Sequence, residues 1–91
     1  STIFNAIGCR VEVEKMISTG RIDMVVETST IIYVLELKLS NNGGVNAAAE
    51  QIKAKRYAEP FKADKRKIIA LAIELEDLGK GLIDWKEVSF A

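Results

Sequence analysis

The stretch from Gly20 to Lys38 constrains the fold more than any other part of the chain. It contains two runs rich in β-branched and apolar residues, joined by a short Thr/Ser segment, and this composition is typical of a β-hairpin. If Ser29 and Thr30 form the loop, the register places Asp23 directly opposite Glu36. Because side chains alternate across a strand, the hairpin then has one face that bears charge and one that is almost wholly apolar.

The acid pair creates an electrostatic conflict that something must relieve. Two carboxylates in directly opposite positions lie about 4.5–5.5 Å apart at Cβ and repel each other, and apolar neighbours disfavour their charged forms. Arg21, Lys38 or a divalent cation could supply the positive charge, since carboxylate oxygens suit such an ion. A salt-bridged patch without a ligand is the alternative. The charged face comprises Arg21, Asp23, Ile32, Val34, Glu36 and Lys38, and the apolar face Ile22, Met24, Val26, Ile31, Tyr33, Leu35, Leu37 and Leu39.

An Asp at the start of one strand and Glu-X-Lys on the next form a recognisable pattern, here Asp23, Glu36 and Lys38. This pattern resembles the catalytic motif of the PD-(D/E)XK nuclease superfamily, with Ile22 in place of the Pro in the motif's name. Two further sequence segments, Gly-Arg-Ile-Asp and Gln-Ile-Lys-Ala-Lys-Arg-Tyr-Ala-Glu-Pro, are similar to segments of the nuclease-like domain at the C-terminal end of predicted AAA-type ATPase-like proteins. The resemblance extends over residues 11–88.

The resemblance implies an α/β fold with a restriction-endonuclease-like core. Its central sheet is mixed: an antiparallel meander is followed by a crossover helix and a parallel strand, and helices flank the sheet. The resemblance also implies that a Gln and a Tyr on the helix, here Gln51 and Tyr57, approach the active site. Alternatively, Gln51 caps a backbone group and Tyr57 packs in the core. The cofactor implied is Mg²⁺ or Mn²⁺, held by Asp23, Glu36 and the carbonyl of Leu37.

Composition bounds the class of protein. The 91 residues suffice for a single domain, residues 1–91, with one core. Thirteen basic and thirteen acidic residues cancel, and there is no His, which removes the commonest general base. A single Cys favours a reducing, cytoplasmic setting. The chain contains no apolar run near the ~20 residues of a membrane helix. Because it lacks a start Met, we expect a fragment of a longer chain, with an N-terminal ATPase domain implied by the resemblance.

Along the chain, the pattern predicts the elements around the hairpin. Residues 1–8 fit the end of an amphipathic helix, so the first helix of the core is largely truncated. Residues 10–16 alternate as a strand on which Glu14 is either a further ligand or a solvated edge residue. A helix runs from residue 45 or 46 to residue 57 or 58, with Asn46 as its cap. Residues 68–73 form a parallel strand buried on both faces, and residues 82–90 a final edge strand.

Local charge predicts where a nucleic acid would bind. Residues 53–67 are strongly basic despite the neutral total. A solvated helix face is the default interpretation, but beside an acid pair such a segment suits a phosphate backbone, and we expect this to be the backbone of DNA. The residues expected to make these contacts are Lys53, Lys55 and Arg56.

The predicted activity is divalent-metal-dependent phosphodiester hydrolysis, with Lys38 orienting the attacking water. The alternative is a catalytically silent module of the same fold that serves an ATPase domain or a protein partner. Because a truncated first helix would leave apolar sheet surface uncovered, we also expect a homo-oligomer. Its interface would bury Ile3, Phe4 and Trp85; a core position for Trp85 is the other interpretation.

Overall fold

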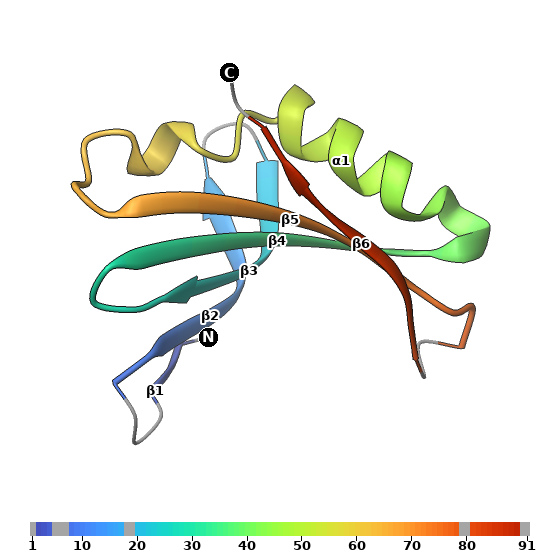
Figure 1. Cartoon of the computed structure of the whole chain (residues 1–91), viewed down its shortest axis with the longest axis horizontal. Helices are drawn as coiled ribbons and strands as arrows, with labels where there is room; N and C mark the ends of the chain where they lie inside the picture. The colour runs from blue at the N-terminus through green and yellow to red at the C-terminus, as the bar shows by residue number, and fades with distance from the viewer. Residues whose placement is uncertain (1, 5–7, 18–19, 79–80, 90–91) are drawn as a thin grey trace.

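The computed structural model describes residues 2–4, 8–17, 20–78 and 81–89. Its framework is a six-stranded sheet in which the strands follow one another in sequence order, β1-β2-β3-β4-β5-β6. Figure 1 shows helix α1 lying across one face of this sheet. The elements are β1 (Thr2–Phe4), β2 (Arg10–Ile17), β3 (Gly20–Glu27), β4 (Ile31–Leu39), η1 (Ser40–Asn42), α1 (Gly44–Ala54), η2 (Glu59–Phe61), β5 (Lys67–Leu75) and β6 (Leu82–Val88).

The predicted hairpin is confirmed, and so is its register from Met24 to Glu27, whereas the predicted pair of Asp23 with Glu36 lies beyond the paired residues. Strands β3 and β4 are antiparallel, with Met24 opposite Leu35. The loop is closed by Thr28, whose N–H donates to the Ile31 carbonyl at 2.8 Å. Its hydroxyl also accepts from the Ile31 N–H at 2.9 Å. These local bonds fix the loop length, and loop length fixes which side chains face each other.

The core lies between the sheet and α1, on the face that carries the acid pair. Val25, Ile32 and Val34 of the hairpin are fully buried there. They pack with Ala48 and Ile52, because these two residues lie one helical turn apart on the same side of α1. The charged face of the hairpin is therefore the covered one. On the other face, the apolar residues of β4 and β5 are only partly buried.

Strand β5 runs parallel to β4, as predicted, and α1 makes the connection between them. The prediction that β5 is buried on both faces is wrong. Ala70 and Ala72 are fully buried beneath the helix, whereas Ile69, Leu71 and Ile73 on the opposite face are intermediate. An unbroken apolar run shows that a strand has two apolar faces, but it does not show that both are covered.

The prediction of a helix end at the N-terminus is also wrong. Residues Thr2–Phe4 form strand β1, which pairs antiparallel with β2. A segment this short gains little from helical propensity, and its β-branched and aromatic residues suit an edge strand. Gly8 has a φ of 81° and lies between the two strands. In the described part of the chain α1 is the single α-helix, so helices do not flank both faces.

The start of α1 is capped from another strand rather than by Asn46. Glu74 of β5 accepts hydrogen bonds from the Val45 N–H at 3.0 Å and from the Ser40 hydroxyl at 2.6 Å. The Ser40 bond is the largest cause, and the Val45 bond the next, of a lowered pKa for Glu74. The first helical residue is Gly44, and its φ of 62° brings the backbone against the Glu74 carboxylate where a Cβ would collide.

The end of α1 comes earlier than predicted, at Ala54, and a Schellman turn causes it. Arg56 adopts the left-handed conformation, with φ of 50°. Tyr57 N donates to the Ile52 carbonyl at 3.3 Å and Arg56 N to the Lys53 carbonyl at 3.2 Å, which is the pair of bonds that defines this turn. The chain reverses here, so Tyr57 follows the helix instead of continuing it.

Strand β6 forms one edge of the sheet, as predicted. The expectation that Trp85 packs in the core is wrong, because 58% of it is exposed. None of the helices in the described part of the chain has the length and hydrophobicity required to span a bilayer.

Candidate active site

The site lies where β3 separates from β4. The ladder between them is continuous from Glu27 to Met24. Beyond Met24 the Leu37 N–H donates instead to the Asp23 side chain, at 2.9 Å from Oδ2. Figure 1 shows the paired ends of β2 and β3 rising toward the side of the sheet that carries α1. Beyond Met24 the ladder is interrupted, and the Asp23 carboxylate takes the place of a backbone partner for the Leu37 amide; we call this interruption of the ladder the gap.

A backbone irregularity in β2 accompanies this separation. Glu14 has a φ of 55°, which is uncommon for a residue other than Gly. It interrupts the pairing of β2 with β3 opposite Asp23, between the pairs Val13–Met24 and Lys15–Ile22. As a result the strict alternation of β3 is lost. Ile22 turns into the core, although the sequence placed it on the opposite face.

Glu36 is the buried acid of the site, with 2% of its surface exposed. Burial is the largest of the effects that raise its pKa, to about 7 from an ordinary value of 4.5. The hydrogen bond from Tyr57 lowers this pKa, while Asp23 raises it through both charge and hydrogen bonding. Asp23 therefore opposes the charged form of Glu36, as expected for two neighbouring carboxylates.

Tyr57 connects the helix end to the acid. Its ring is fully buried, and its hydroxyl lies 2.9 Å from Glu36 Oε1 and 2.7 Å from the Arg21 carbonyl. The Gln51 side chain donates to the same hydroxyl at 3.0 Å. Burial raises the pKa of Tyr57 to about 12, so the phenol stays protonated. One hydroxyl proton cannot serve the Glu36 carboxylate and the Arg21 carbonyl at once, so these two acceptors compete for it.

Lys38 shares the helix-covered face of β4 with Glu36, two residues further along the strand. Its ammonium is close enough for its charge to lower the pKa of Glu36. No ion pair with Lys38 occurs within the described ranges. This lysine is therefore available to a negatively charged group that enters the gap.

The oxygen atoms at the gap fit a hard divalent cation. Asp23 and Glu36 each use one carboxylate oxygen for a protein donor. In a strand the N–H and C=O of one residue point to the same edge, so the Leu37 carbonyl faces the gap together with its N–H. Two carboxylates and a carbonyl are ligands that Mg²⁺ and Mn²⁺ accept, with waters completing the shell. Among the described residues, no group of three or more His, Cys, Asp or Glu side chains is placed to hold a metal ion.

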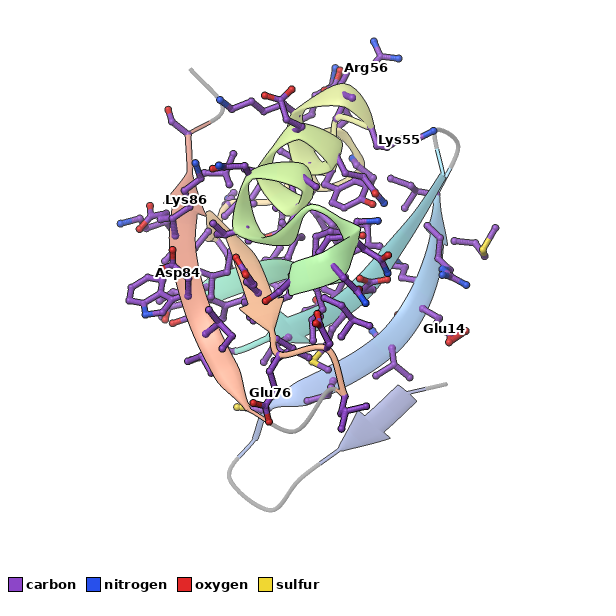
Figure 2. The ribbon with its side chains drawn as sticks, turned by 90° about the vertical axis from the view of Figure 1, so that its right-hand side faces the viewer. Glu14, Lys55, Arg56, Glu76, Asp84 and Lys86 are labelled. Atoms are coloured by element: carbon purple, nitrogen blue, oxygen red, sulfur yellow. The ribbon has the colours of Figure 1, made fainter. Side chains whose placement is uncertain are left out.

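Two residues considered for the site are placed elsewhere. Glu14 is exposed, and its carboxylate lies 3.9 Å from the Arg21 guanidinium. Figure 2 shows Glu14 at the outer side of β2, directed away from the body of the molecule. Arg21 is thus engaged with Glu14 and does not neutralise the acid pair, whereas its backbone carbonyl does reach the site through Tyr57.

The three basic residues proposed for nucleic-acid contact gather at the end of α1. Lys53 is exposed in the last helical turn. The Lys55 side chain lies over Gly20, so a Cβ there would meet it at 3.4 Å. Figure 2 shows Lys55 directed toward the β2–β3 end, while Arg56 points outward at the top of the molecule. Arg66, in the same basic segment, instead binds Glu27 and Asp64, each at 2.8 Å.

Sequence reasoning missed two contacts that shape the site. The Leu37 amide orients Asp23, and the Arg21 carbonyl anchors Tyr57. Both are backbone groups, so no residue type in the sequence marks them. A break in the β3–β4 pairing could have been suspected only from the cost of placing two acids opposite each other.

Comparison with known proteins adds three findings. A family model described as PD-(D/E)XK nuclease superfamily matches residues 2–85. A relative from Azotobacter chroococcum mcd 1, named "Uncharacterized protein in vnfD 5'region", is 35% identical over 71 residues. The match covers 78% of this chain and 14% of the relative, so the chain spans a small part of that protein's length. No solved structure matches the chain.

Proposed function

Because this chain belongs to the PD-(D/E)XK nuclease superfamily, we propose that it hydrolyses phosphodiester bonds in nucleic acid with a divalent metal ion. The single observation that carries the proposal is the gap between β3 and β4. There Asp23 is oriented by the Leu37 amide, and Glu36 is buried beside it. Lys38 lies on the same face of the strand. A buried acid with a strongly raised pKa is costly, and such groups concentrate at functional sites.

The proposed mechanism assigns one role to each side chain. Asp23 and Glu36, with the Leu37 carbonyl, would hold Mg²⁺ or Mn²⁺. When bound, this ion would supply Lewis-acid activation of a phosphoryl oxygen and of water. Glu36 would act as a ligand in its ionised form, and the hydrogen bond from Tyr57 keeps its carboxyl group oriented. Lys38 orients the attacking water and offsets the negative charge that develops on the phosphoryl group.

The basic residues at the end of α1 support a proposal for the substrate, and the family resemblance supports one for the neighbouring domain. Lys53, Lys55 and Arg56 supply phosphate contacts, for which DNA is the proposed partner. No step needs base recognition. The single Cys favours a cytoplasmic setting, and the resemblance suggests an N-terminal ATPase domain. The alternative is a catalytically silent module that binds a partner, and this alternative predicts that the protein does not cleave DNA.

Plasmid nicking tests the proposal. Wild-type protein should nick supercoiled DNA with Mn²⁺ and not with EDTA. Lys38→Ala should abolish nicking while retaining Mn²⁺ affinity, because the ammonium is not a ligand. Asp23→Asn should lose both. Lys15→Ala is the matched control, because Lys15 is a β2 lysine whose ammonium lies 3.6 Å from Glu12, and nicking should persist in this variant. Metal binding without nicking by the wild type would favour the silent module.

A further inference from the structure

The exposed apolar side chains of this protein gather on strand β6. Among the described residues, the large hydrophobic side chains classed as exposed include Leu82 at 61%, Ile83 at 56% and Trp85 at 58%. Leu78, in the turn that leads into β6, is exposed as well. An open strand edge with apolar side chains is a template for pairing with another chain.

The outward hydrogen-bonding groups of β6 are positioned for such pairing. The β5–β6 ladder has a β-bulge at Glu74/Leu75, and beyond it the Glu76 N–H donates to the Gly81 carbonyl at 2.9 Å. Hydrogen-bonded and non-hydrogen-bonded pairs alternate along an antiparallel ladder, so counting from Glu76–Gly81 across the bulge makes Ile73–Trp85 a non-hydrogen-bonded pair. Trp85 therefore directs its N–H and C=O to the open edge. Its N–H is met by the Asp84 carboxylate, at 2.8 Å from Oδ1. This local bond is one that a second strand could replace.

The charges of β6 are complementary to the same strand run in the opposite direction. If two copies pair antiparallel about Trp85, Asp84 of each faces Lys86 of the other. Registers centred on Asp84 or on Lys86 would place like charges face to face, which destabilises a sheet. Both side chains lie along β6 at the outer side of the sheet in Figure 2. Within the described ranges neither side chain forms an ion pair that would compete.

We infer that β6 is a self-association edge, at which a second copy of this chain pairs antiparallel about Trp85 to join two sheets into one. The Asp84–Lys86 pairs lie on the α1 side of the joined sheet, where Lys86 now makes a 3.3 Å bond to Asn46. The two Trp85 side chains meet on the other face, because directly opposite residues point the same way. The interface is isologous, so it closes at a dimer. It does not depend on the proposed nuclease activity.

Charge exchange tests this interface. Sedimentation equilibrium should show a reversible wild-type dimer. Asp84→Lys alone, or Lys86→Asp alone, should weaken association by about tenfold or more, because each places two like-charge pairs opposite each other. An equimolar mixture of these two variants should form a heterodimer, and the double exchange should restore the homodimer. Glu50→Lys, the same charge change at an exposed position of α1, is the matched control and should dimerise like the wild type.

The chain's only Trp gives a second readout, since its fluorescence should shift to shorter wavelength as dimer forms. Circular dichroism establishes that each variant is folded. A wild-type protein that stays monomeric at its highest concentration would overturn the inference. So would single reversals that associate as tightly as the wild type, which would indicate pairing through another surface.

Discussion

At the scale of single residues, Glu36 is the most consequential group in the protein. It is buried in a site that also contains Asp23, and the Tyr57 hydroxyl donates a hydrogen bond to its Oε1 atom. Such surroundings favour the protonated form of a carboxyl group. Burial and the neighbouring Asp23 therefore make the charged form of Glu36 costly.

Stability should therefore depend on pH through Glu36. Its folded pKa of about 7 lies above its ordinary value of 4.5, so the folded state holds the extra proton between these values. The free energy of unfolding should be highest near the lower pKa and should fall as pH rises through 7. The loss is about 3 kcal/mol at 1.36 kcal/mol per unit.

The measurement is chemical denaturation in EDTA at a series of pH values. Glu36→Gln keeps the shape without the charge, so it should flatten the curve and be the more stable protein at about pH 8. Glu50→Gln, which changes an exposed acid on α1, should leave the wild-type slope intact. A wild-type curve that rises between pH 5 and pH 8 would contradict the assignment.

At the scale of elements, the turn after α1 is the device that brings Tyr57 to the acid. Arg56 holds the left-handed position, where Gly is the usual residue, and a side chain there costs about 1 kcal/mol. Strained positions that persist often serve function. Here the strain is consistent with a role for the Arg56 guanidinium in contacting phosphate.

Arg56→Gly should separate stability from binding. Removing the left-handed penalty should raise the free energy of unfolding by about 0.5–1 kcal/mol. Losing the guanidinium should weaken DNA binding and make it less dependent on salt. Lys53→Ala, which removes a charge one turn away, should weaken binding without the gain in stability. Thermal melts and fluorescence anisotropy measure the two effects, and an Arg56→Gly variant with unchanged DNA affinity would remove Arg56 from the proposed surface.

The elements that local pattern specifies were predictable from the sequence. The hairpin register followed from loop position and alternation, and the parallel placement of β5 from the intervening helix. The end of α1 was not predictable, because Arg56 gives no sign that its backbone is left-handed. The N-terminal strand was missed because three apolar positions at short spacing fit a helix as well as an edge strand.

At the scale of the whole molecule, the chain places its charged pair on the covered face of the sheet and leaves the other face less covered. The family resemblance identified the site residues from the sequence. In the structure, hydrogen bonds join Gln51, Tyr57 and Glu36, and Asp23 and Lys38 lie close enough for their charges to change the pKa of Glu36. Their linkage could not be read from sequence. It depends on contacts between residues far apart in the chain, such as Tyr57 with Arg21.

The central claim is that the gap between β3 and β4 is a metal site, and titration calorimetry with Mn²⁺ tests it most directly. Binding requires an ionised Glu36, so the affinity should be about tenfold higher at pH 8 than at pH 6, with proton release at the lower pH. Asp23→Asn should weaken binding strongly at both values, and Lys38→Ala should not. Absence of binding by a folded wild-type protein, or binding that Asp23→Asn leaves unchanged, would contradict the account.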